Sequence, residues 1–188
     1  MNNQKTIGII IGIIALIVLG FFFLESRKEP TTTPTPSSKI AGFDGKNSSF
    51  TIDGRTVKLA NGVSVVDAAP GSASKVTTRY FGNEAYGDLN GDGTIDTAFL
   101  ISEDSGGSGL FYYVVVALTE KNGYKMTNAF LIGDRIAPQT TEINQSAREL
   151  HINFAERKAG EPMTTSPSVG AVLLLKVTPA GVLEGLMK

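Results

Sequence analysis

The sequence contains no cysteine, and its formal net charge is only −1. Without cysteine the chain has no disulfide, no thiolate metal site and no cysteine nucleophile, so an exported domain would depend on its hydrophobic core alone. The balanced charge gives no indication of a nucleic-acid or anionic-surface partner. With 188 residues, the chain is long enough for one domain with appendages.

The long apolar run of the sequence lies near its start. Residues 7–24 form 18 consecutive positions without a charged or strongly polar side chain. As a helix rising about 1.5 Å per residue, this run nearly matches a hydrocarbon core of about 30 Å. A helix of a soluble domain would keep a polar face. We therefore expect a short tail at residues 1–6 and a single-pass transmembrane signal-anchor helix at residues 7–24.

The residues at the end of the apolar run and the charges on either side of it bear on whether the anchor is cleaved and how it is oriented. Small residues at positions 18 and 20 leave a cleaved signal peptide as the alternative, but the apolar run continues to Leu24. Lys5 before the run and Arg27 with Lys28 after it nearly balance the positive-inside signal. Orientation is therefore inferred from the rest of the chain, which has the character of an exported domain.

After the anchor, residues 25–39 are rich in proline, threonine and serine. Such a stretch cannot bury a core and favours an extended polyproline II linker. From residue 40 the pattern changes to short apolar runs separated by glycine and proline. We place residues 25–188 outside the cytoplasm at the cell membrane, with residues 40–188 as the domain.

Residues 40–188 carry the signals of β-structure. Asp53-Gly54 between two alternating runs predicts a hairpin, because this pair accepts the positive φ of a tight turn. Buried or half-buried strands are predicted at residues 110–118, 150–154 and 169–177. We expect about eight to ten strands, no helix after the anchor, and a mostly β fold: a single antiparallel β-sandwich or partly open barrel. Tyr112 and Tyr113 would point to opposite faces, leaving one available at the surface.

The segment 88–96 has the chemistry of a calcium loop. Oxygen-bearing side chains occupy its positions 1, 3, 5 and 9, and Gly93 at position 6 permits a sharp turn. Calcium prefers six to eight hard oxygen ligands. The predicted ligands are the side chains of Asp88, Asn90, Asp92 and Asp96 and the backbone carbonyl of Thr94.

The charge around this loop supports a bound Ca²⁺ ion. Between Arg79 and Lys121 there is no basic residue, and the acidic residues there would repel one another without a bound cation. These acidic residues are Glu84, Asp88, Asp92, Asp96, Glu103, Asp104 and Glu120. The alternative is a plain pair of Asn-Gly and Asp-Gly turns, since these residues favour turns in any case.

The loop resembles the calcium loops of FG-GAP-type β-propeller repeats and, less closely, those of dockerins and thrombospondin type 3 repeats. It is not an EF-hand, because position 12 is Phe99 where an EF-hand has a bidentate glutamate. The resemblance covers nine residues. A single copy excludes a propeller, which requires repeats.

A longer pattern resembles a family of uncharacterised bacterial exported proteins of the cell envelope. It consists of GDLNGDGTIDTAFLI (87–101), GGSGLFYYVVVAL (106–118), GDRI (133–136) and GEPMTTSPS (160–168). The resemblance implies an envelope location and a shared fold, but no reaction.

These observations predict a membrane-anchored, calcium-binding structural or interaction module without catalysis, whose partner is an unknown envelope protein or polymer. One alternative is an envelope-polymer hydrolase using acidic residues such as Glu84, Glu103 or Asp104. Another is an inhibitor or stress-response module. A serine triad is disfavoured, because the only histidine, His151, follows Ser105, whereas chymotrypsin-like proteases place histidine and aspartate first.

Overall fold

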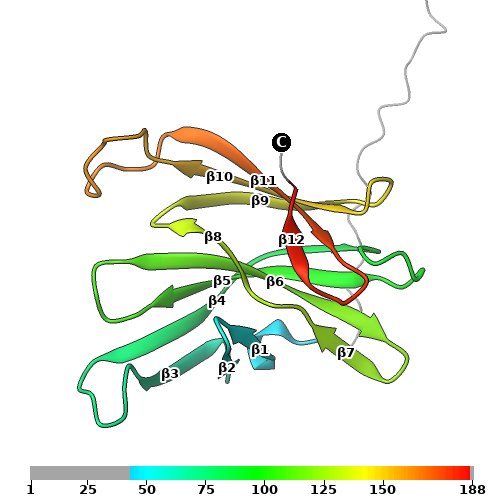
Figure 1. Cartoon of the computed structure of the whole chain (residues 1–188), viewed down its shortest axis with the longest axis horizontal. Helices are drawn as coiled ribbons and strands as arrows, with labels where there is room; N and C mark the ends of the chain where they lie inside the picture. Colours follow the sequence, from blue (N-terminus) through cyan, green and yellow to red (C-terminus); the bar gives the residue numbers. More distant parts are fainter. Residues whose placement is uncertain (1–42, 187–188) are drawn as a thin grey trace, which may run out of the picture. The chain divides into compact units, whose positions relative to one another are not determined.

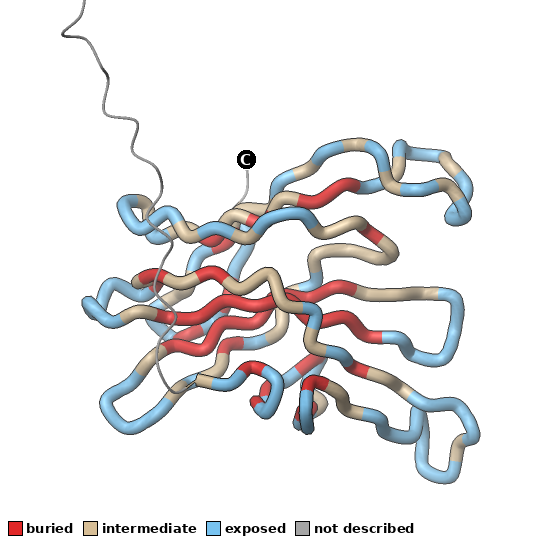
Figure 2. Tube along the Cα trace, turned by 180° about the vertical axis from the view of Figure 1, so that it is seen from behind, coloured by how far each residue is buried: buried red, intermediate tan, exposed pale blue. Residues whose placement is uncertain are grey.

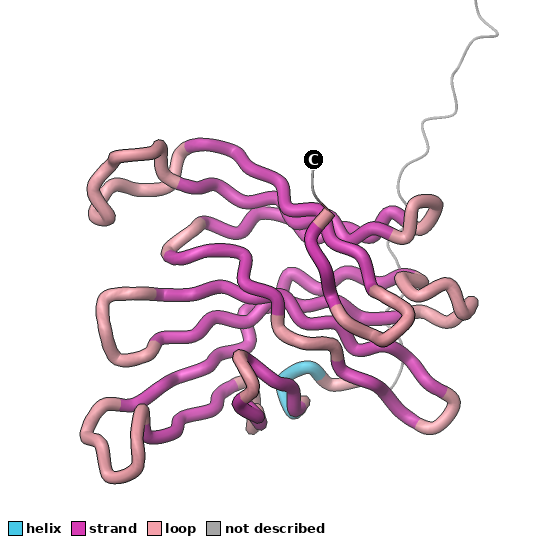
Figure 3. The backbone as a smooth tube through the Cα atoms, viewed as in Figure 1, coloured by secondary structure: helices cyan, strands magenta, loops and turns pink. Residues whose placement is uncertain are grey.

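The computed structural model describes residues 43–186, which form twelve strands and one short 3-10 turn, Gly45–Asn47 (Figure 1). The predicted tail, anchor and linker at residues 1–39 lie outside the described residues. Within residues 43–186, no helix has the length and apolar character needed to span a bilayer. Turns and loops of different lengths connect the strands, as Figure 3 shows. The prediction of a mostly β domain is therefore confirmed.

The larger sheet has six strands. Its order is β3-β4-β5-β6-β7. Strand β7 pairs with one part of β6, and β8 pairs with another part of it. Every ladder in it is antiparallel. The strands are β3 (Val63–Asp67), β4 (Lys75–Gly87), β5 (Asp96–Asp104), β6 (Leu110–Glu120), β7 (Gly123–Met126) and β8 (Phe130–Asp134).

A second, four-stranded antiparallel sheet has the order β12-β11-β10-β9. In the described part of the chain each sheet has free edge strands, so neither closes into a barrel. The expected strand count was too low because several edge strands are only three to five residues long. The strands of this sheet are β9 (Ala137–Asn144), β10 (Glu149–Glu156), β11 (Val169–Val177) and β12 (Leu183–Gly185).

The first hydrophobic core lies between the two sheets. Leu100 from β5 and Val114 from β6 meet Leu150, Ile152 and Leu175 of the opposing sheet, and all five are fully buried. Because side chains alternate along a strand, this core uses every second residue of β5 and β6. The remaining residues of these strands must be covered from the other side.

The hairpin of β1 (Ser49–Ile52) and β2 (Arg55–Lys58) provides this cover. Its Phe50 and Val57 pack in a second core with Phe99 and Val115. Strands β5 and β6 are thus buried on both faces, as the red central tubes in Figure 2 show. The hairpin turn confirms the Asp53-Gly54 prediction: φ is 47° at Asp53 and 78° at Gly54.

This extra layer corrects one expectation. Tyr112 and Tyr113 do point to opposite faces, but each is buried, one in the first core and the other in the second. The prediction that one tyrosine would be available at the surface is wrong. A hairpin far away in sequence covers the second face, and the local alternation of side chains cannot reveal that cover.

A carboxylate between two phenols predicts an alkaline limit to stability. The hydroxyls of Tyr80 and Tyr86 both donate to Glu84. Burial first, and then the hydrogen bond to this carboxylate, raises the pKa of each phenol well above its usual value. In the unfolded chain a tyrosine ionises near pH 10. The stability that the two phenols contribute is therefore complete below about pH 10 and falls as the pH rises from there through the folded pKa.

We expect the free energy of unfolding, measured by denaturant titration, to fall between about pH 10 and about pH 11.5. In Tyr80→Phe the fall should be smaller, since one of the two phenols that donate to Glu84 is gone. A free energy that stays level over this range would contradict the prediction.

Candidate metal loop and adjoining pocket

The predicted calcium loop connects the end of β4 to the start of β5. Strand β4 ends at Gly87, and β5 begins at Asp96. Gly91 and Gly93 have φ values of 81° and 85°, which residues with a side chain rarely adopt. The two glycines therefore allow the eight intervening residues, 88–95, to coil tightly between adjacent strands.

The polar side chains of the loop accept hydrogen bonds from its own backbone. The two carboxylate oxygens of Asp88 accept from the amides of Gly91, at 2.6 Å, and Gly93, at 3.0 Å. Asn90 Oδ1 accepts from the amide of Asp92 at 3.0 Å, and Asp92 Oδ1 accepts from the amide of Thr94 at 2.8 Å. The hydroxyl and amide of Thr94 lower the pKa of Asp92. The loop thus orders itself into successive turns.

Asp96 is the buried end of the loop. Its side chain is fully buried, and its two oxygens accept from the amides of Leu89 and Thr119, each at 2.9 Å. Burial raises the pKa of Asp96, the two amides oppose that change, and the nearby carboxylates of Asp92 and Asp88 add to it. This one carboxylate joins the start of the loop to the end of β6.

The five predicted ligands therefore belong to one compact loop and offer only oxygen donors. In this conformation the carboxylates face backbone amides, and among residues 43–186 no three acidic or histidine side chains are arranged to hold a metal ion together. A carboxylate has about four acceptor positions, so the amides leave part of each group's capacity free. Binding an ion requires these side chains to turn inward from their present amide contacts.

We compared the chain with known proteins. No family model, curated protein or solved structure matches it.

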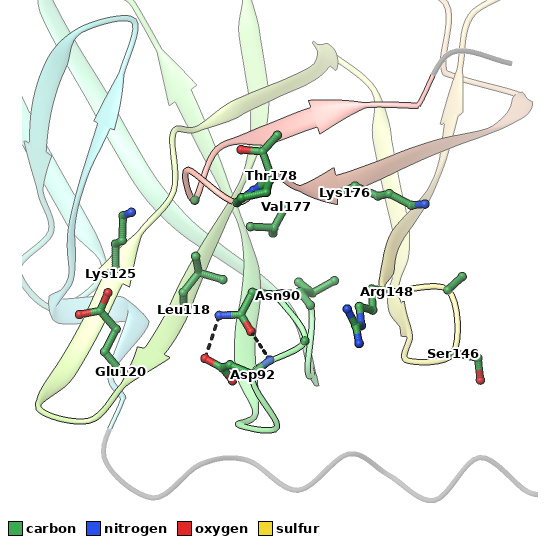
Figure 4. A pocket seen from close by; sticks show the side chains of 15 residues that line it. Asn90, Asp92, Leu118, Glu120, Lys125, Ser146, Arg148, Lys176, Val177 and Thr178 are labelled. Atoms are coloured by element: carbon green, nitrogen blue, oxygen red, sulfur yellow. Dashed lines mark hydrogen bonds between the residues drawn. The ribbon is translucent and has the colours of Figure 1, made fainter.

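The loop forms one wall of a pocket of about 770 Å³ (Figure 4). Glu120 and Lys125 lie on one side of the pocket, Arg148 and Lys176 lie on the other, and Leu118 lies between them. Besides these residues, the lining consists of Leu89, Asn90, Gly91, Asp92, Ser146, Ala147, Val177, Thr178, Pro179 and Gly181.

Sequence reasoning missed the basic residues of this pocket. Lys125 is on β7, Arg148 is in the turn between β9 and β10, and Lys176 is on β11. The acidic segment 80–120 contains no basic residue of its own, but the fold brings these three to its loop from distant segments. No spacing or motif connects them, so no signal in the sequence could have found them.

The acidic residues proposed for hydrolysis have structural partners instead. Glu103 is buried and accepts from Arg55 Nη2 at 2.6 Å and from Thr78 Oγ1 at 2.8 Å. Asp104 accepts from the amide of Gly106 at 2.8 Å, and Glu84 binds the two phenols described above. None of the three lines the pocket. His151 lies half-buried on β10 with Glu149 as its partner, at 3.1 Å.

Proposed function

We propose that this chain is a membrane-anchored, extracytoplasmic module of the bacterial cell envelope, which binds calcium through residues 88–96 and acts in structure or interaction rather than catalysis. The observation that carries the proposal is the fully buried carboxylate of Asp96 beside the carboxylates of Asp88 and Asp92. The loop that holds them offers oxygen donors suited to a hard divalent cation.

The electrostatics of the loop favour a cation. A buried carboxylate is costly unless it is paired as well as hydrogen-bonded. In the described residues, none of the ion pairs between side chains involves Asp88, Asp92 or Asp96. A Ca²⁺ ion would supply the missing positive charge and offset the mutual repulsion of the three groups.

The predicted ligands are Asp88, Asn90, Asp92, the carbonyl of Thr94 and Asp96, and water would complete the six to eight positions. Phe99, at the position of the EF-hand glutamate, is fully buried in the second core and cannot contribute. With no bidentate glutamate, we expect a dissociation constant of about 10⁻⁴–10⁻³ M, as in extracellular modules. Free calcium outside cells would suffice for such a site.

The membrane location rests on the apolar segment 7–24, which would hold residues 25–188 outside the cytoplasm. Two hydrophobic cores give the cysteine-free domain a basis for stability without disulfides. The partner that we propose is another protein or a polymer of the envelope.

Calcium is expected to stabilise the full-length chain in detergent micelles against thermal unfolding. At about one hundred times the dissociation constant, the gain should be about 2.7 kcal/mol over the same protein in EDTA. Circular dichroism melting over a calcium titration measures it. An unchanged midpoint at about 100 mM calcium, one hundred times the upper end of the expected dissociation constant, would refute calcium binding.

A matched pair of variants localises this effect. Asp92→Asn removes one carboxylate of the exposed part of the loop and should abolish most of the calcium-dependent gain. Asp104→Asn removes an exposed carboxylate outside the loop, which also accepts a hydrogen bond from a backbone amide. It should retain the full response. Equal responses in the two variants would place the ion elsewhere.

A further inference from the structure

The pocket beside the loop has features that calcium binding does not explain. Its volume of about 770 Å³ lies within the range of about 300–1,000 Å³ that is typical of small-molecule sites. Arg148 and Lys176 form a basic side, whereas Glu120 and Lys125 on the opposite side combine an acceptor with a donor (Figure 4). The distribution of charge around the pocket therefore indicates the chemistry of the ligand that it would bind.

Arg148 has an unfavourable backbone conformation. Its φ is 54°, in the left-handed region that glycine and asparagine occupy at much lower cost. A second arginine, Arg135, has a φ of 49°, but its contacts hold it in place. Arg135 pairs with Asp134 at 2.6 Å, and its carbonyl accepts from Arg157 at 2.8 Å. Arg148 closes the four-residue turn between β9 and β10, a usual place for a positive φ, and among the described residues no ion pair or side-chain hydrogen bond involves its guanidinium.

The side chain of Arg148 lies against the loop. A Cβ atom built on Gly91 would be 2.3 Å from Arg148 Nη1, so the glycine leaves the space that the guanidinium occupies. The guanidinium thus lies in the wall of the pocket, with donors available to a ligand. Lys176 is a second cation on the same side, and its distance of 3.6 Å from Glu149 is too long for a strong hydrogen bond.

The opposite side of the pocket discriminates between kinds of anion. Asp92 and Glu120 would repel a ligand that is negative throughout, and Lys125 would repel an ammonium group placed beside Glu120. Hydroxyl groups suit this side, because each can donate to a carboxylate and accept from an ammonium group. The hydroxyl of Thr178 and the amide of Asn90 add further polar groups to the lining.

We propose that the pocket binds a small polyhydroxylated oxyanion, such as an acidic or phosphorylated sugar unit. Arg148 and Lys176 contact its carboxylate or phosphate, and Glu120 and Lys125 contact its hydroxyls. The pocket shares Asn90 and Asp92 with the proposed calcium site, so the proposal concerns the calcium-free protein, and titrations in EDTA test it apart from the proposed function. An Arg148 guanidinium suits both carboxylate and phosphate, since it can bind either one through two parallel hydrogen bonds.

Isothermal titration calorimetry on the full-length chain tests the proposal. The protein is kept in EDTA and in a polyoxyethylene detergent, because a sugar headgroup would compete. The probes are glucuronate, glucose 6-phosphate, neutral glucose, inorganic phosphate and the zwitterion alanyl-alanine. Glucuronate or glucose 6-phosphate should bind at least about tenfold more tightly than the other three, given the strength of charge-assisted hydrogen bonds. If glucuronate binds more tightly than glucose 6-phosphate, the natural anion is a carboxylate. The reverse order indicates a phosphate.

The decisive variant is Arg148→Gly. It should weaken binding about tenfold or more while leaving the thermal midpoint unchanged or higher, because glycine accepts the left-handed backbone without strain. Arg148→Lys should weaken binding less, since it keeps the charge. Lys176→Gln, on a strand away from the turn, should also weaken binding, whereas Lys121→Gln, an exposed lysine outside the pocket, should not.

The proposal is overturned if neither sugar anion binds, or if glucose, phosphate or the dipeptide binds as tightly as they do. It is also overturned if Arg148→Gly and Lys176→Gln bind the sugar anions like the unsubstituted chain. A calcium response that fails while these titrations succeed would refute the proposed function and leave the pocket proposal standing.

Discussion

Replacing Phe99 with alanine is expected to lower the free energy of unfolding by about 3–5 kcal/mol, the usual cost of deleting a fully buried phenylalanine. Phe99 is fully buried in the second core, and its ring centroid lies 5.8 Å from that of Phe43, 6.2 Å from that of Phe50 and 5.7 Å from that of Tyr80. The substitution leaves a cavity between the hairpin β1–β2 and the larger sheet.

Denaturant titration followed by circular dichroism measures this loss. Phe81→Ala is the matched control, because Phe81 is 42% exposed and contacts one ring, that of Tyr112. It should cost about 1 kcal/mol. Equal losses in the two variants would mean that the hairpin does not cover β5 and that the second core does not exist in solution.

Asp96→Ala is expected to cost about 1–3 kcal/mol for the buried amide of Leu89 and less for the part-buried amide of Thr119, because both lose their acceptor. The same variant should lose the thermal response to calcium, because the proposed ligand at the end of the loop is gone. Thermal and denaturant unfolding, each with calcium and with EDTA, measure both effects.

Asp96→Asn separates the two roles of this side chain. Its amide oxygen can still accept from one of the two backbone amides, so the loss of stability in EDTA should be smaller than in Asp96→Ala. Without the carboxylate charge, the calcium response should still be weak. If Asp96→Asn were to respond to calcium like the unsubstituted chain, Asp96 would not be a ligand.

Much of the strand structure could be predicted because local residues determine it. Asp53 and Gly54 adopt the positive φ values that their types favour, and the apolar run at residues 169–177 matches β11 from end to end. The alternation at residues 150–154 lies within β10. The hairpin layer could not be predicted, because covering the second face of β5 and β6 depends on contacts between distant segments.

The loop could be predicted from local sequence, whereas the pocket could not. The glycines and Asx residues at 88–96 specify a coiled loop by themselves, so its boundaries could be predicted. The burial of Asp96 depends on Thr119 at the end of β6, and the pocket draws Arg148 and Lys176 from other strands and turns. No local sequence pattern indicates either of these two arrangements.

Under the proposed membrane tether, the two-stranded layer would have a mechanical consequence. The described chain begins at Phe43, whose ring lies 5.8 Å from that of Phe99 and 4.8 Å from that of Tyr124. Strands β1 and β2 come next in the chain and form a sheet of their own, which Thr51 joins to Asn128 through an isolated bridge. Tension transmitted along the preceding residues would therefore load this layer first, peeling it from Phe99 while the ladders of the two larger sheets still hold.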